Sequence, residues 1–167
     1  MNGNEQLEGT LYTNLAFKFS IRFPEGWKVK DGDGENVVKH AFGPTRGAMN
    51  VSIAHPDEER LRALGPDSLE EALNLLMESS VHSLVLQLAG EVVSQSLGVV
   101  NGMPAAYCQV NAVHLDHATG RTPMVFQQIL CYKHGLIYMV TAAVRAEDMK
   151  FFDAAIKESF ASFTVSD

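Results

Sequence analysis

The sequence predicts an α+β protein in which an antiparallel β-sheet is sandwiched by helices. Three observations lead to this prediction. Residues 17–54 contain short apolar runs separated by turn signals, which is typical of strands. Residues 91–145 form consecutive hairpins, which imply antiparallel pairing. Residues 68–90 and 147–163 instead place apolar side chains at helical spacing, so we expect these two segments to cover the sheet.

The N-terminal third predicts a meander of short strands. In residues 17–23 large apolar side chains alternate with polar ones, as in a strand with one buried face. A turn then leads to Trp27, which begins a second strand and which we expect to lie in the core. Residues 37–42 and 48–54 predict two further strands. The loop between them, residues 43–47, lacks the Gly-Lys-Ser/Thr sequence of a phosphate-binding loop.

Two amphipathic helices are expected to flank the sheet. Ser68 and Glu71 have the spacing of a capping box, in which the Ser68 hydroxyl accepts a hydrogen bond from the Glu71 backbone N–H. The apolar stripe of this central helix consists of Leu69, Ala72, Leu73, Leu76, Met77 and Leu84. The C-terminal helix is expected to bury Met149, Phe152, Ile156 and Phe160. Its Asp153 and Lys157 are spaced for an i,i+4 ion pair.

A third, short helix is predicted over residues 57–64. Its acidic residues come first and its basic residues later, which suits the helix dipole. The charged run has two interpretations: it could dock a basic partner, or it could be the solvated surface of a helix. We favour the solvated helix because charge runs of this kind usually face water.

Three long strands, residues 103–115, 121–133 and 136–145, are expected to lie consecutively antiparallel at the centre of the sheet. The first follows Asn101-Gly102, which predicts a type I′ turn after the strand at residues 91–100. In the resulting pairing, residue 131 lies opposite about residue 105. Cys108 and Cys131 then lie on different faces of the sheet, so we predict two buried free thiols and no disulfide.

The composition indicates one globular domain over residues 1–167, with a flexible polar tail at residues 1–9. The 167 residues carry 13 basic and 20 acidic side chains, a net charge of −7 that argues against a nucleic-acid partner. The longest apolar run, residues 136–144, is about half of the roughly 20 residues that a membrane helix needs, so no membrane span is expected. The chain as given shows no signal peptide.

A family resemblance emerges from the arrangement of motifs. Residues 17–27, Phe-Lys-Phe-Ser-Ile-Arg-Phe-Pro-Glu-Gly-Trp, resemble the entry motif of the PsbP-like superfamily. The hairpin at residues 100–105, the long strand around residues 138–141 and the closing helix that ends at Phe163 follow in the matching order. The resemblance covers roughly residues 15–163. The superfamily includes the photosystem II extrinsic PsbP subunit, DcrB-type and LpqN-type bacterial envelope proteins, the yeast Ran-release factor and immunity-related secretion chaperones.

The resemblance implies an α/β/α sandwich that binds proteins and usually lacks catalysis. It implies a soluble domain of a bacterial envelope protein or lipoprotein, with a leader removed and a lipid anchor upstream. A cytoplasmic chaperone or adaptor of the same fold is the alternative. The expected partner is another protein, and the chain itself is expected to be a monomer or a homodimer. We expect no cofactor and no enzymatic activity, and no residue role transfers from the family because its members do different jobs.

A metal site is the third alternative, and it would depend on His114, Asp116 and His117. These side chains offer two imidazoles and a carboxylate near a hairpin tip, a ligand set that a divalent metal can use. An exposed loop explains the same residues, and three clustered ligands seldom make a tight site. The other histidines are scattered, and the sequence contains neither a Gly-x-Ser-x-Gly nor a His-Glu-x-x-His motif.

Large apolar side chains on the helices allow a further hypothesis. Met77, Phe151, Phe152 and Phe160 could line a groove for an apolar peptide, which would suit a chaperone. Their helical spacing is also what core packing produces, and we favour core packing.

Overall fold

The computed structural model describes residues 3–64, 68–116, 118 and 120–167. Within these residues, eleven strands form two antiparallel sheets. The small sheet has the order β1 (Glu5–Glu8), β2 (Leu11–Asn14), β3 (Phe19–Arg22) and β11 (Thr164–Val165). The large sheet has the order β4 (Lys28–Asp31), β5 (Val37–Phe42), β6 (Ala48–Ala54), β10 (Leu136–Arg145), β9 (Gly120–Lys133), β8 (Met103–Asp116) and β7 (Glu91–Val100).

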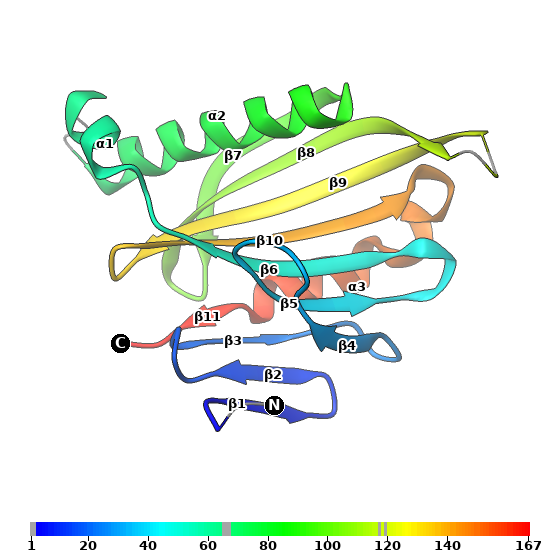
Figure 1. Ribbon diagram of the computed structural model, residues 1–167, viewed down its shortest axis with the longest axis horizontal. Helices are drawn as coiled ribbons and strands as arrows, with labels where there is room; N and C mark the ends of the chain where they lie inside the picture. The colour runs from blue at the N-terminus through cyan, green and yellow to red at the C-terminus, as the bar shows by residue number, and fades with distance from the viewer. Residues whose placement is uncertain (1–2, 65–67, 117, 119) are drawn as a thin grey trace.

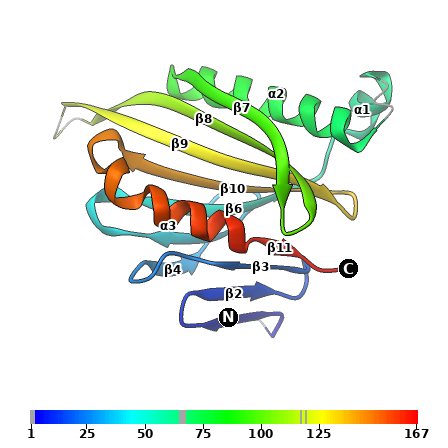
Figure 2. The same cartoon turned by 180° about the vertical axis from the view of Figure 1, so that it is seen from behind.

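The helices lie on opposite faces of the large sheet. They are α1 (Glu58–Leu64), α2 (Leu69–Leu88) and α3 (Met149–Ser162), with short 3₁₀ turns at Pro44–Arg46 and Ala146–Asp148. Figure 1 shows α2 across β7, β8 and β9, and Figure 2 shows α3 on the other face beside the small sheet. One buried cluster fills the space between the large sheet, α3 and the small sheet, and a second lies under α2. The predicted α+β sandwich is therefore confirmed.

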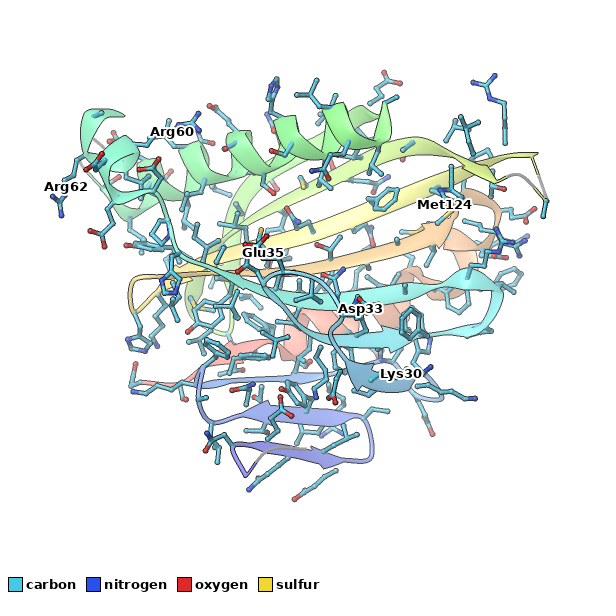
Figure 3. All side chains as sticks on the ribbon, in the orientation of Figure 1. Lys30, Asp33, Glu35, Arg60, Arg62 and Met124 are labelled. Atoms are coloured by element: carbon cyan, nitrogen blue, oxygen red, sulfur yellow. The ribbon has the colours of Figure 1, made fainter. Side chains whose placement is uncertain are left out.

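The helix cap and the ion pair predicted from the sequence are present in the structure. The Ser68 hydroxyl accepts a hydrogen bond from the Glu71 backbone N–H at 3.1 Å, which begins α2 as the capping pattern predicts. The Lys157 ammonium donates to Asp153 at 2.6 Å along the surface of α3. In α1, Arg62 pairs with Glu58 at 3.3 Å, and both side chains are more than two-thirds exposed. Figure 3 shows Arg60 and Arg62 extending from α1 away from the sheets, as expected of a solvated helix.

The register of the long strands agrees with the sequence. Cys131 of β9 lies opposite Ala105 of β8, and Cys108 lies opposite Gln128. The two thiols are free, buried and on different faces of the sheet, as predicted. Trp27 is buried as well, with 6% of its surface exposed.

The small sheet is the main departure from the predicted architecture. The expected tail at residues 1–9 is wrong for Glu5–Glu8, which form β1 and pair with β2. The predicted strand at residues 17–23 forms β3, but it pairs with β2 and β11 and not with the strand that follows Trp27. The N-terminal third is therefore split between two sheets and is no single meander. The reason is that β3 presents large apolar side chains, which pack against α3 and the large sheet in a separate layer.

Candidate functional site

A groove of about 710 Å³ lies on one flank of α3. We call it the aromatic groove. Its large apolar lining residues are Phe23, Pro24, Trp27, Phe151 and Phe152. The turn between β3 and β4 supplies the first three of these residues, and the first turn of α3 supplies the other two. The exposed charged side chains of Arg22, Glu25 and Glu158 lie around it. The groove is therefore apolar inside and mixed in charge at its edge.

The floor of the aromatic groove is held rigidly. The Trp27 and Phe152 rings meet edge to face with centroids 5.9 Å apart. A Cβ atom at Gly43 would collide with the Trp27 ring, so glycine allows the indole to lie directly on the backbone of the large sheet. Because the indole is packed from both sides, it forms a fixed surface for whatever enters the groove.

Hydrogen bonds tie α3 to β3 along the same groove. The Ser159 hydroxyl donates to the Arg22 carbonyl at 2.7 Å, and the Ser162 hydroxyl accepts from the Arg22 backbone N–H at 2.8 Å. These bonds satisfy a strand backbone that would otherwise need water. These hydrogen bonds, together with side-chain packing, hold α3 at a fixed spacing from β3 and the turn that follows it.

Phe151 is the exposed aromatic residue of this groove. Its side chain is 69% exposed, whereas Phe152, one position later, is half-buried in the core. The Lys150 ammonium lies 4.9 Å from the centroid of the Phe151 ring. Aromatic side chains are enriched at the centres of protein interfaces, so Phe151 beside this groove is a candidate anchor for a partner.

A second groove, of about 560 Å³, lies on the other flank of α3 against β7, β8 and β9. Its lining mixes apolar side chains with polar ones, among them Ser94, Gln109 and Gln127. The Gln127 Oε1 atom is buried without a hydrogen-bond partner. Lys157 also lines this groove but is already paired with Asp153. The groove therefore offers mainly amide groups for hydrogen bonding.

The thiols of Cys108 and Cys131 are unreactive at neutral pH. Burial raises the pKa of Cys108 to about 11 and that of Cys131 to about 12. Both are therefore protonated at neutral pH, and a thiol, unlike a thiolate, is neither a good nucleophile nor a metal ligand. Across residues 3–64, 68–116, 118 and 120–167, no three His, Cys, Asp or Glu side chains come together in a way that could hold a metal ion.

The predicted metal ligands fall at the limit of what the structure describes. His114 is an exposed residue of β8 opposite Thr122 of β9. Asp116 ends β8, but its side chain lies outside the described part of the chain, as does the whole of His117. The metal site at these three residues therefore stays a prediction.

The hypothesis of an apolar groove on the helices is correct for two of its four residues. Met77 and Phe160 are buried core residues, as core packing predicts. Met77 belongs to α2 and packs against the face of the large sheet opposite to α3. Phe151 and Phe152 do share a groove. Its other wall, from Phe23 to Trp27, was not foreseen, although the Phe-Pro-x-Gly-Trp sequence marks that turn as unusually aromatic.

The two-layered covering of one antiparallel sheet, by α2 on one face and by α3 with the small sheet on the other, is the PsbP-like fold. Cyanobacterial PsbP (CyanoP) from Synechocystis sp. PCC 6803 is similar with a TM-score of 0.66, at 12% identity over 96% of this chain and 95% of that chain. The Ran-binding protein Mog1p from Saccharomyces cerevisiae gives 0.58, at 11% identity over 97% of each chain. LpqN of Mycobacterium tuberculosis, described as involved in cell envelope biogenesis, gives 0.51, at 8% identity over 89% and 83%.

These likenesses show the fold and no more, because the sequence identities are so low. No protein-family model matches the sequence, and no curated protein matches it either. The predicted resemblance to the PsbP-like superfamily is confirmed at the level of the fold.

Proposed function

We propose that this chain is a non-catalytic domain that binds another protein, and that the partner sits in the aromatic groove. The observation that carries the proposal is Phe151, a phenylalanine with 69% of its side chain exposed beside a preformed groove floored by Trp27. Exposed aromatic side chains at rigid apolar grooves contribute much of the binding energy in protein interfaces. The description of Mog1p as a Ran-binding protein supports protein binding as a use of this fold.

The groove defines the chemistry of the partner segment. Its apolar floor suits an aliphatic or aromatic side chain, and the backbone of that segment would run past Arg22, Glu25 and Glu158. Because the edge carries both charge signs, electrostatics would determine the register in which a segment binds and would contribute less to its affinity. The partner is thus a protein segment with an apolar anchor flanked by charges of both signs.

Site-specific photo-crosslinking tests this proposal with a matched control. A photoreactive phenylalanine analogue is placed at position 151 in one variant and at position 86 in another, since Leu86 on α2 is 68% exposed and Phe151 is 69% exposed. In cells of the source organism, position 151 is expected to give one discrete cross-linked protein that position 86 does not give. The captured protein is then produced and its affinity measured by calorimetry.

Substitution separates specific capture from chance contact. Phe151→Ser is expected to weaken the affinity for that protein about tenfold or more, because an anchor side chain is lost. Leu86→Ser is expected to bind as the wild type does. Equal affinity of the Phe151→Ser variant and the wild type would rule out the aromatic groove as the binding site.

For the cellular setting we propose the bacterial envelope, with the chain acting as a single domain behind a removed leader or a lipid anchor. The description of LpqN supports this setting. A cytoplasmic chaperone or adaptor of the same fold is the alternative, and the genomic sequence upstream of Met1 distinguishes the two. Within the described residues, no helix has both the length and the apolar character needed to cross a membrane.

A further inference from the structure

The strand β7 has an open edge. It spans ten residues at one end of the large sheet and pairs with β8, and no other strand in the described part of the chain pairs with its outer side. From Glu91 to Val99 every residue is exposed, and the exposed apolar ones are Val92, Val93, Leu97 and Val99. A long apolar edge strand with free backbone groups readily pairs with a further strand.

The two edges of the large sheet differ in protection. At the opposite end, β4 is only four residues long and carries Lys28, Lys30 and Asp31. Figure 3 shows Lys30 at this end of the molecule. Short length and lysine side chains are common devices against edge pairing. In β7 the only charged residue is Glu91, the first residue of the strand, and β7 contains neither lysine nor proline.

The hairpin after β7 determines which backbone groups are free. Asn101 and Gly102 have φ angles of 45° and 76° and form a two-residue loop between the paired residues Val100 and Met103. The pair that flanks such a loop is hydrogen-bonded, and hydrogen-bonded pairs alternate along an antiparallel ladder. The backbone N–H and C=O groups of Gln95, Leu97 and Val99 therefore point away from β8.

The side chains of these same three residues share one face. They lie opposite Cys108, Ala106 and Pro104 of β8, respectively. Cys108 and Ala106 belong to the cluster under α2, so Gln95, Leu97 and Val99 project on the α2 face of the sheet. Gln95 and Leu97 thus present free backbone groups to a partner strand, and their side chains could be covered by it. At Val99 the carbonyl accepts a hydrogen bond from the Tyr107 hydroxyl at 3.2 Å, which a partner strand would replace.

We propose that β7 pairs antiparallel with β7 of a second copy of this chain, about a two-fold axis at Leu97, to form one continuous sheet. In this register Leu97 faces Leu97 of the second copy and Gln95 faces its Val99. No charged residue occurs from Val92 to Val100, so no like charges meet. Although each copy carries a net charge of −7, contact along this edge brings no charged side chains of the two β7 strands together.

The symmetric arrangement also limits growth of the assembly. An isologous β7 pair uses both open edges and leaves the two protected β4 edges at the ends, so the assembly closes as a dimer. This interface is independent of the aromatic groove, which lies between α3 and the β3–β4 turn.

Sedimentation measurements test the association. The wild-type chain is expected to reach twice the monomer mass of 18.3 kDa as its concentration rises. Leu97→Lys is expected to weaken association about a hundredfold or more, because two ammonium groups would meet at the axis. Val113→Lys is the control, since Val113 on β8 is 42% exposed and Leu97 is 37% exposed. Thermal unfolding of both variants shows whether the fold is intact.

A cysteine variant tests the register without adding charge. In a hydrogen-bonded antiparallel pair the Cα atoms are about 5.5 Å apart, a spacing that a disulfide can span. Leu97→Cys is therefore expected to form a disulfide-linked dimer under mild oxidation, whereas Val113→Cys stays monomeric on a denaturing gel. The native cysteines are buried and do not compete. A wild type that remains monomeric when pure, as it would if β7 pairs with another protein, or a Leu97→Lys variant that dimerises normally, would overturn the proposal.

Discussion

Trp27 connects the core to the proposed binding surface. Its ring packs on Phe152, and its neighbour on the sheet side is Gly43, where no side chain larger than hydrogen fits. The same indole lines the aromatic groove. One residue thus contributes to stability and shapes the groove floor.

Replacing Trp27 with Ala is expected to lower the free energy of unfolding by about 3 to 5 kcal/mol, because a buried aromatic side chain is removed and a cavity is left. Urea unfolding followed by circular dichroism measures the change. Phe151→Ala is the control and is expected to be nearly neutral, since its ring is mostly exposed. Near-wild-type stability of the Trp27→Ala variant would contradict the core role.

The sequence predicted residue burial better than it predicted surface geometry. Trp27, Ile156 and Phe160 were expected in the core and are buried. Phe151 lies outside the predicted stripe of Met149, Phe152, Ile156 and Phe160, but the favoured interpretation of core packing placed it in the core, and its 69% exposure shows that this was wrong. The groove also needs the β3–β4 turn, which meets α3 only through contacts more than a hundred residues apart.

At the scale of elements, Asn101 joins the β7–β8 hairpin to the end of α3. Its Nδ2 group donates to the Ala161 carbonyl at 2.7 Å and to the Phe163 carbonyl at 2.9 Å. Both carbonyls lie at the C-terminal end of α3, where backbone carbonyl groups have no N–H donor within the helix. The turn residue predicted from the Asn-Gly sequence therefore also caps a helix that is distant in the sequence.

Two substitutions separate these roles of Asn101. Asn101→Gly keeps the positive φ angle of 45° accessible but removes the amide, and it is expected to cost about 1 to 2 kcal/mol because helix-end carbonyls lose their donor. Asn101→Ala is expected to cost about 1 kcal/mol more, since alanine is strained at positive φ. The comparison uses the free energy of unfolding in urea. If the glycine variant were as stable as the wild type, the capping role would be refuted.

Elements with strong local signals were predicted well, and those that depend on distant pairing were not. The bounds of β5, β6, β7 and β10 match the predicted strands residue for residue. The small sheet was missed because β1 and β2 have four residues each and β11 has two. Strands this short carry little periodic signal, and only their pairing stabilises them.

At the scale of the whole molecule, ion pairs link separate layers. Lys39 of β5 is 3% exposed and donates to Asp31 of β4 at 2.6 Å and to Glu5 of β1 at 3.3 Å. The ammonium also lies 4.7 Å from the centroid of the Tyr12 ring in β2. A single buried cation therefore joins the edge of the large sheet to the small sheet. Burying it is tolerable only because it is paired.

Three carboxylates predict how stability depends on pH. The ammonium groups of Lys39 and Lys133 hold the pKa values of Asp31 and Asp167 below their ordinary value of 3.8, and the Arg145 guanidinium does the same for Asp148. A pKa that is lower in the folded than in the unfolded chain adds stability above the unfolded value. That contribution is lost as the pH falls through the lowered folded values.

We therefore expect the free energy of unfolding to fall as the pH drops below about 4, the region where unfolded aspartates begin to bind protons. Urea unfolding at a series of pH values measures this. The variant Asp31→Asn with Asp148→Asn and Asp167→Asn is expected to be less stable at neutral pH and to have a shallower acid dependence. An unchanged acid dependence in this variant would show that other carboxylates dominate.

The small sheet draws β1, β2 and β3 from one end of the chain and β11 from the other. During synthesis on the ribosome, three of its strands are made more than a hundred residues before the fourth. This layer therefore cannot close until Val165 has been made, and until then Phe19 of β3 lacks its contacts with β11 and with the Phe163 ring. Until that strand has been made, a nascent chain of this protein is thus exposed to chaperones and proteases.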